Sequence, residues 1–293
     1  MLQFLFEQYG YYPTNFIDNT FFVDSWMFKL IEIDETETYI DKIDEYISVV
    51  REKIDRYSIF LIKTRFNKKI SIYDGKRYVL MSSLVKELSF ADLNRFHYVM
   101  MEPDKTLDLN NLLVIWKERT DLIENQYVNS LRIDSIHYNS NIEVSMFALG
   151  LAQNSSQYLS EIINDFGQYL ENLTLTHKRL VDLQSFEFYN PFNLIVDHPI
   201  KDLCELYKND FLSFEEMEQK FEIYNLDSKL ASVFVARMLY PNKIFDLLEK
   251  NYYDKDVSFT ISVSIEKEIM KIKKIYLYFK QKYDIKPIEW LEY

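Results

Sequence analysis

Glycine is scarce in this chain, which has only four glycines among its 293 residues. Average usage of about 7% would give roughly 20. The four are Gly10, Gly75, Gly150 and Gly167, and no two of them are close together. Walker loops, dinucleotide-binding loops and nucleophile elbows all need closely spaced glycines. The sequence therefore excludes a glycine-rich phosphate loop and removes the usual support for hydrolases, P-loop NTPases and nucleotide oxidoreductases.

The composition indicates a folded, acidic protein. Hydrophobic residues make up 48% of the chain and aromatic residues 16%, and the formal net charge is -12. An acidic chain repels nucleic-acid backbones, which bind clustered Lys and Arg. The sequence has no run of 18 apolar residues, and the stretch from Met1 to Gln8 lacks the basic start of a signal peptide. We expect a cytoplasmic protein with no nucleic-acid partner and no membrane span.

Neither the cysteine nor the histidines predict a covalent or metal site. Cys204 is the only cysteine, so no intrachain disulfide can form, and its apolar neighbours Leu203 and Leu206 favour a small buried side chain over a nucleophile. The four histidines show no metal-ligand spacing. We therefore expect no zinc site.

Residues 1–83 read as a strand-rich domain with one long helix. Three strands are predicted over 11–18, 20–24 and 26–31, since these stretches are rich in aromatic and β-branched residues. A helix should follow, capped by Asp34, with an apolar stripe at spacings of three and four from Ile40 onward. Further strands are predicted over 59–63 and in a hairpin around Asp74-Gly75, a turn dipeptide.

Residues 84–293 read as a mainly helical domain. A buried helix is predicted over 145–163, and another is expected to begin with Asp202 as its cap. Ser264 should start a late helix with a lysine-rich face, which we interpret as a solvated outer face. The chain has 23 Tyr and 22 Phe. We expect some of these aromatic residues, including those of 288–293, to form a protein-binding surface.

The segments 176–180 and 197–203 resemble the catalytic centre of the aminoglycoside and choline phosphotransferases, which share the protein-kinase fold. In that family the loop reads His-Gly-Asp-Leu, then a metal-binding Asp, then an Asp-Leu pair that opens a helix. His177 and Leu180 match this frame, and Asp202 matches the helix-opening, structural Asp. The resemblance implies a bilobal α+β fold with a small strand-rich lobe and a larger helical lobe.

Three further segments resemble the spore-coat, YutH-type branch of these kinase-like proteins. They are residues 91–97 with their Phe-His ending, the helical stretch 112–126, and Arg237 to Pro241 with the residues behind it. Their order along the chain is a stronger signal than any one of them. The resemblance implies a link to spore-coat assembly.

The catalytic loop departs from the family pattern at its chemical positions. Arg179 stands where the catalytic Asp belongs, and Gln184 stands where the family has a metal-binding Asn. The Asp accepts or orients the substrate hydroxyl, whereas a guanidinium has five donors and no acceptor. A shifted register would make Asp182 the base, but this alternative lacks the His two residues earlier and has Glu187 five residues later.

The cofactor-binding residues that the resemblance implies are Lys29, Glu45, Glu52 and Asp197. Lys29 is at the place of the lysine that holds nucleotide phosphates, with Glu45 or Glu52 as its partner from the long helix. The alternative is that Lys29 is a solvent-facing strand residue. Asp197 is the candidate metal contact, although only four residues separate it from Asp202, fewer than the family usually has.

These departures predict a pseudokinase that acts as a binding or scaffold component with a protein partner, with no cofactor required. Two alternatives stay open. One is an active phosphotransferase that uses ATP and Mg²⁺ on a small hydroxyl or amino substrate, with Asp182 or Asp197 in an unfamiliar arrangement. The other is a purely structural coat protein without a ligand cleft. In each case the expected location is the cytoplasm, with an association with the spore coat.

Overall fold

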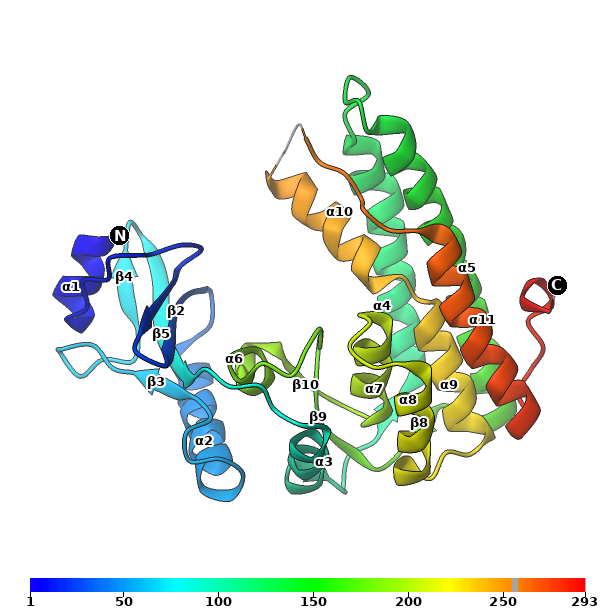
Figure 1. The fold of residues 1–293 in the computed structure, drawn as a ribbon, viewed down its shortest axis with the longest axis horizontal. Helices are drawn as coiled ribbons and strands as arrows, with labels where there is room; N and C mark the ends of the chain where they lie inside the picture. Colours follow the sequence, from blue (N-terminus) through cyan, green and yellow to red (C-terminus); the bar gives the residue numbers. More distant parts are fainter. Residues whose placement is uncertain (255–257, 293) are drawn as a thin grey trace. The chain divides into compact units, whose positions relative to one another are not determined.

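The computed structural model describes residues 1–254 and 258–292. The chain divides into two compact units (Figure 1). Met1–Glu102 and Thr174–Asp197 form the first unit, and Pro103–Leu173 and His198–Tyr293 form the second. The predicted boundary after residue 83 falls at the end of a strand inside the first unit. A segment from the second half of the sequence therefore belongs with the N-terminal strands.

The first unit combines a five-stranded sheet, a small three-stranded sheet and four α-helices. In chain order, its elements are α1 (Leu2–Tyr9), β1 (Thr20–Val23), β2 (Trp26–Ile33), α2 (Glu37–Lys53), β3 (Phe60–Ile62), β4 (Ser71–Tyr73), β5 (Lys76–Leu84), α3 (Phe90–Val99), β6 (Met101–Glu102), β9 (Leu173–His177), α6 (Ser185–Tyr189), a 3-10 turn (Pro191–Asn193) and β10 (Leu194–Asp197). The larger sheet has the order β1-β2-β5-β3, and β4 also pairs with β5. The smaller sheet has the order β10-β9-β6.

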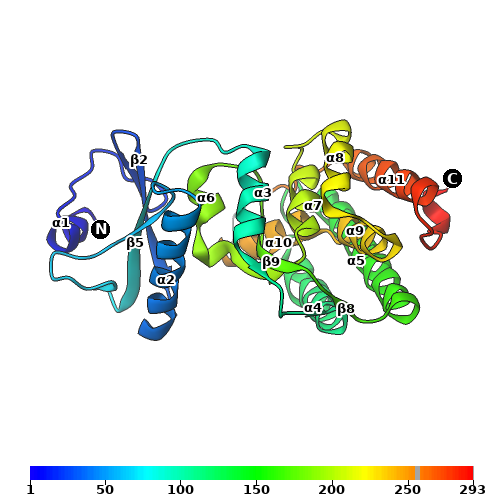
Figure 2. The same cartoon turned by 90° about the horizontal axis from the view of Figure 1, so that it is seen from below.

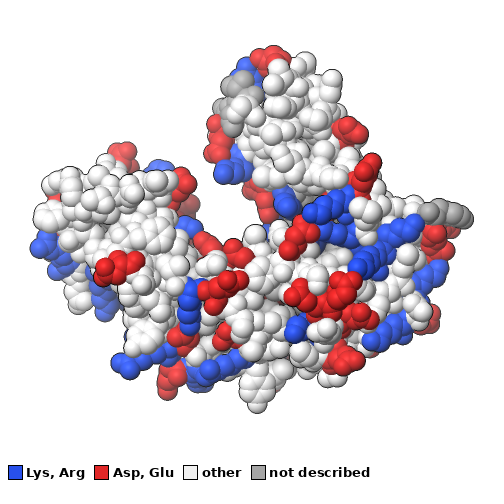
Figure 3. All heavy atoms as spheres, viewed as in Figure 1, with Lys and Arg blue, Asp and Glu red and all other residues white. Residues whose placement is uncertain are grey.

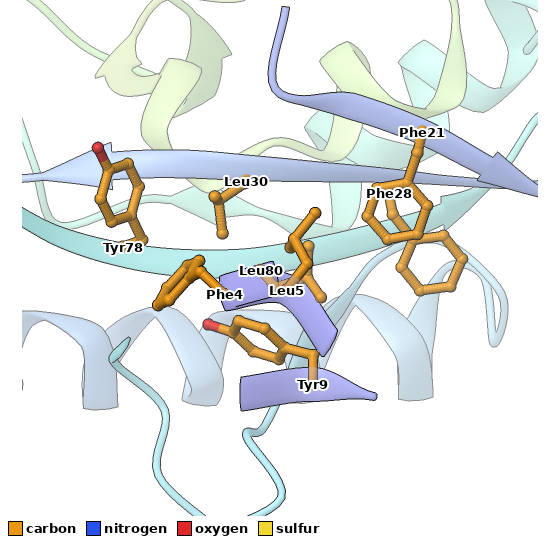
Figure 4. Close-up of a cluster of buried hydrophobic side chains, with 8 residues drawn as sticks. All are labelled: Phe4, Leu5, Tyr9, Phe21, Phe28, Leu30, Tyr78 and Leu80. Carbon is orange, nitrogen blue, oxygen red and sulfur yellow. The ribbon is translucent and has the colours of Figure 1, made fainter. Parts of the chain in front are cut away.

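Helix α1 covers one face of the larger sheet. Figure 4 shows its side chains packed against aromatic and leucine side chains of β1, β2 and β5. The buried members of this cluster are Phe4, Leu5, Tyr9, Phe21, Phe28, Leu30, Tyr78 and Leu80. Helix α2 lies on the other side of the sheet (Figure 2). Because side chains alternate along a strand, Lys29 points away from the face that carries Phe28 and Leu30.

The local predictions for this unit are mostly confirmed, with two corrections. Strands β1, β2 and β3 and the β4–β5 hairpin match the prediction. Residues 11–18 form no named strand, because the sheet begins only after Asp18 and Asn19, whose positive φ angles of 50° and 60° turn the chain. The cap of α2 is Thr36, whose hydroxyl accepts a hydrogen bond from the Tyr39 amide, so Asp34 lies outside the helix.

The second unit is helical, as predicted. Its elements are β7 (Leu107–Asp108), α4 (Leu109–Leu122), a π turn (Ile123–Tyr127), a 3-10 turn (Val128–Ser130), α5 (Tyr138–Phe166), β8 (Tyr169–Leu170), α7 (Ile200–Lys208), α8 (Phe214–Phe221), a 3-10 turn (Glu222–Tyr224), α9 (Ser228–Leu239), α10 (Asn242–Asp254), α11 (Ile265–Lys282) and a 3-10 turn (Glu289–Leu291). The long helix α5 packs against α4, α9 and α10, and α9 also packs against α7 and α11.

Helix α11 has the predicted Ser264 cap and the predicted lysine-rich face. Four of its lysines, Lys267, Lys271, Lys274 and Lys280, are paired with acidic groups of the same unit. Lys271 lies 2.8 Å from Asp210, and Lys274 lies 2.9 Å from Glu215. On the face drawn in Figure 3, basic side chains stand beside acidic ones in this unit. The side chain of Lys274 is 50% exposed, as expected for a solvated outer face, whereas that of Lys271 is only 10% exposed. None of the helices in residues 1–254 and 258–292 combines the length and apolar character needed to cross a membrane.

Candidate functional site

The candidate catalytic loop joins two paired strands of the first unit. Strands β9 and β10 are antiparallel, and His177 at the end of β9 is opposite Leu194 at the start of β10. Residues 178–193 span this hairpin and include α6. The same hairpin therefore holds both ends of the loop.

His177 has a structural role in this loop. Its side chain is fully buried, and its Nε2 atom donates a hydrogen bond of 2.8 Å to the Phe188 carbonyl oxygen. The imidazole also packs against Phe96 and Phe188, at 5.6 Å and 4.9 Å between ring centroids. His177 thus ties the beginning of the loop to α6.

Arg179 is held by the backbone of the loop. Its Nη1 atom donates to the Lys178 carbonyl at 2.7 Å. Asn193 fixes its main chain from the other end of the loop, because Asn193 Nδ2 donates to the Arg179 carbonyl at 2.8 Å and Asn193 Oδ1 accepts from the Arg179 amide at 3.3 Å. Sequence reasoning missed Asn193. Its place directly before an apolar strand was the available signal.

Asp182 and Gln184 form a local turn that starts α6. The Asp182 carboxylate accepts a hydrogen bond of 2.9 Å from the Gln184 amide, and Gln184 is the residue before the helix. Gln184 also forms a bridge with Glu87. An Asp that accepts its own backbone two residues ahead is a common turn device, so this contact gives Asp182 a structural task.

Asp197 and Asp202 lie in different units, and both are buried. Asp197 ends β10, and α7 begins at Ile200 with Pro199 before it. Asp202 is therefore inside the first turn of α7, and the prediction that it caps this helix is wrong. The chain passes from strand to helix within two residues, which leaves no separate loop after Asp197.

Lys29 is paired with a carboxylate of the loop. Its Nζ atom lies 2.8 Å from Glu187 Oε1 and 5.5 Å from the centre of the Phe186 ring. The sequence predicted Glu45 or Glu52 of α2 as the partner, but Glu187 of α6 takes this place. Both α2 residues are exposed. The sequence could not reveal the pairing because 158 positions separate Lys29 from Glu187.

A cavity of about 410 Å³ opens beside the loop in the first unit. Its lining is Arg179, Leu180, Val181, Asp182, Glu187, Asn190, Phe192 and Asn193. This lining includes the candidate base positions Arg179 and Asp182. No group of three or more His, Cys, Asp or Glu residues suited to hold a metal ion occurs in the described part of the chain.

Cys204 is buried in α7, and burial raises the pKa of its thiol to about 12. The thiolate is the reactive form of cysteine. We expect the native protein to be inert toward the thiol reagent DTNB at pH 8 and to react with one equivalent after unfolding in urea. Fast reaction of the native protein, followed by absorbance, would show that the thiol is accessible.

The strand-rich unit with its long helix, the helical unit and the paired strands around the loop are the features of a kinase-like protein. The chain belongs to the family described as Spore coat putative kinase YutH, whose model matches residues 3–276. The predicted family resemblance is thereby confirmed.

Two of the solved structures that resemble this chain are phosphotransferases. A spectinomycin phosphotransferase, solved with ADP and spectinomycin, is 13% identical with a TM-score of 0.54, and the match covers 96% of this chain and 97% of that one. An aminoglycoside phosphotransferase from Alicyclobacillus acidocaldarius is 10% identical with a TM-score of 0.49 and coverage of 92% and 90%. No curated protein matches the chain. The first likeness confirms the predicted fold class.

Proposed function

We propose that this protein is a catalytically inactive kinase-like protein that acts as a binding or scaffold component of the spore coat. The observation that carries the proposal is Arg179 in the loop between β9 and β10, at the position where the family resemblance expects the catalytic Asp. A guanidinium cannot accept the proton of a substrate hydroxyl. Losing such an acid–base group commonly costs 10²- to 10⁴-fold in rate.

Two further features support this proposal. Asp182, the alternative base, accepts the Gln184 amide in a turn. Asp197, the candidate metal ligand, is followed within two residues by α7. Kinases hold Mg²⁺ through a loop Asn and a later Asp, and Gln184, at the Asn position, forms part of a turn and a bridge. These residues do not fit a Mg²⁺–ATP site, so we derive no phosphoryl-transfer step.

The first test is turnover of ATP by the purified protein. We expect no ADP formation above a buffer control in the presence of Mg²⁺ and small aminoalcohol acceptors. Turnover that disappears in Asp182→Ala or Asp197→Ala but survives in Lys178→Ala would establish the active phosphotransferase instead. Lys178 is the matched control because it lies in the same loop and its amine contacts the Phe192 carbonyl.

The second test asks whether the protein contributes to the coat without catalysis. In a sporulating strain that lacks the gene, Asp182→Ala should restore coat structure as fully as the unaltered gene. A complementation defect with normal protein levels and an unchanged urea midpoint of the purified variant would contradict an inactive role. If Asp182→Ala restores the coat and the unaltered protein binds no other coat protein in a pairwise assay, these two results together favour the purely structural alternative.

A further inference from the structure

Residues 183–187, here called the internal plug, are hydrogen-bonded to the chain that leaves β5. The Leu88 amide donates to the Leu183 carbonyl at 2.8 Å, and the Ser185 amide donates to the Lys86 carbonyl at 3.0 Å. The Ser185 hydroxyl in turn accepts the Lys86 amide at 3.3 Å. Both the N–H and the C=O of Lys86 are therefore used by Ser185.

The internal plug is part of the core of the first unit. Leu183 and Ser185 are each 2% exposed, and Phe186 is 3% exposed. The Ser185 hydroxyl also lies 3.2 Å from the hydroxyl of Ser83, a residue of β5. Buried backbone and hydroxyl groups need such partners, because each one left without a hydrogen bond lowers the free energy of unfolding. The internal plug is thus anchored at Ser185, two residues before Glu187.

Because Ser185 is fixed in place, the Glu187 carboxylate two residues later lies next to Lys29. The lysine of a kinase N-lobe strand holds the phosphates of the nucleotide, so a carboxylate at 2.8 Å supplies the anion that a phosphate would otherwise supply. A tethered group of this kind competes at an effective concentration on the order of millimolar. A phosphate that approaches Lys29 must compete with a carboxylate that is part of the same chain.

We propose that residues 183–187 are a built-in ligand of the phosphate-binding lysine, with Glu187 standing in for a phosphate and Ser185 fixing the segment to the end of β5. This inference rests on the proposed function, because it takes Lys29 as the descendant of a kinase lysine. It identifies the Glu187 carboxylate as the group that keeps nucleotide phosphates away from Lys29. It also predicts that removing the single carboxylate opens a polyphosphate site on this chain.

The test measures binding of inorganic tripolyphosphate, and then of ATP, to the full chain by isothermal titration calorimetry. Glu187→Ala should bind tripolyphosphate about two- to fivefold more tightly than the unaltered protein, and adding Lys29→Met should remove the gain. Glu187→Asp keeps the charge and should behave like the unaltered protein. The matched control is Glu52→Ala, which removes an exposed carboxylate of the same unit and should gain nothing.

Fold integrity is not at risk in this design, because both side chains of the pair are at least one third exposed and such pairs contribute little to stability. Equal binding by Glu187→Ala and the unaltered protein would overturn the internal plug. The same holds if Glu52→Ala gains as much as Glu187→Ala. ATP turnover by the unaltered protein would overturn both the proposed function and the internal plug, whereas tight ATP binding without turnover would overturn only the internal plug.

Discussion

Replacing Phe96 with alanine is expected to destabilise the first unit by about 3–5 kcal/mol, the usual cost of removing a fully buried phenylalanine. Phe96 is completely buried in α3. Its ring lies 5.6 Å from His177 and 5.1 Å from Phe188 between centroids. The variant therefore leaves a cavity beside His177 and beside α6, the helix to which His177 is hydrogen-bonded.

The measurement is hydrogen exchange of peptides from residues 86–102 and 174–197, followed by urea unfolding. Tyr98→Ala is the matched control, because Tyr98 is in the same helix but 79% exposed. Surface changes of this kind usually stay within about 0.5 kcal/mol. If Phe96→Ala and Tyr98→Ala unfold at the same urea concentration, Phe96 does not organise the loop.

Replacing Leu291 with alanine is expected to destabilise the second unit by about 2–5 kcal/mol. Leu291 is fully buried and Ile288 is 7% exposed, although both are near the end of the sequence. The Tyr276 hydroxyl of α11 accepts the Ile288 amide at 3.0 Å and donates to Glu292 at 2.6 Å. The segment 284–292 is therefore bound to the helices of its own unit.

These contacts change the expectation for residues 288–293. The sequence predicted a protein-binding surface there, whereas only part of the segment is accessible, with Trp290 at 39% exposure; Tyr293 lies outside the described residues. Trp290→Ala should change the urea midpoint little. A large loss from Trp290→Ala with none from Leu291→Ala would reverse the assignment of the two side chains. Binding of a protein partner should therefore be compared between the unaltered protein and Trp290→Ala. Truncation of residues 288–293 would also remove the buried Leu291 and damage the fold.

The sequence predicted those parts of the fold that are specified by a few neighbouring residues. The Asp74-Gly75 turn specifies the β4–β5 hairpin through the positive φ angles of both residues, and Ser264 starts α11 through its own hydroxyl. Helix α1 was missed because its burial depends on Phe28, Leu30 and other strand residues that come later in the chain. Its apolar residues Leu2, Leu5, Phe6 and Tyr9 recur at helical spacing, but over only eight residues, which is shorter than the window that identifies a helix.

The sequence predicted which residues belong to the candidate loop, and their chemistry stays a prediction, whereas their contacts were not predicted. Arg179 was recognised because the family frame assigns a residue type to each position of the loop. The partner of Lys29 was assigned to α2, because that frame expects a helix glutamate. Only tertiary structure brings Glu187 beside Lys29, and no periodicity in either segment encodes a contact across 158 residues.

The discontinuous first unit has a consequence for how the protein is made. Its N-terminal sheet can pair as soon as β5 has been synthesised, but β9, α6 and β10 follow only after the 71 residues Pro103–Leu173 of the other unit. At roughly 5–20 residues per second, the ribosome needs several seconds to deliver them. During that interval Leu88, Phe96 and the backbone of Lys86 lack their partners from residues 183–188, so the first unit cannot complete its core until the later segment has been synthesised.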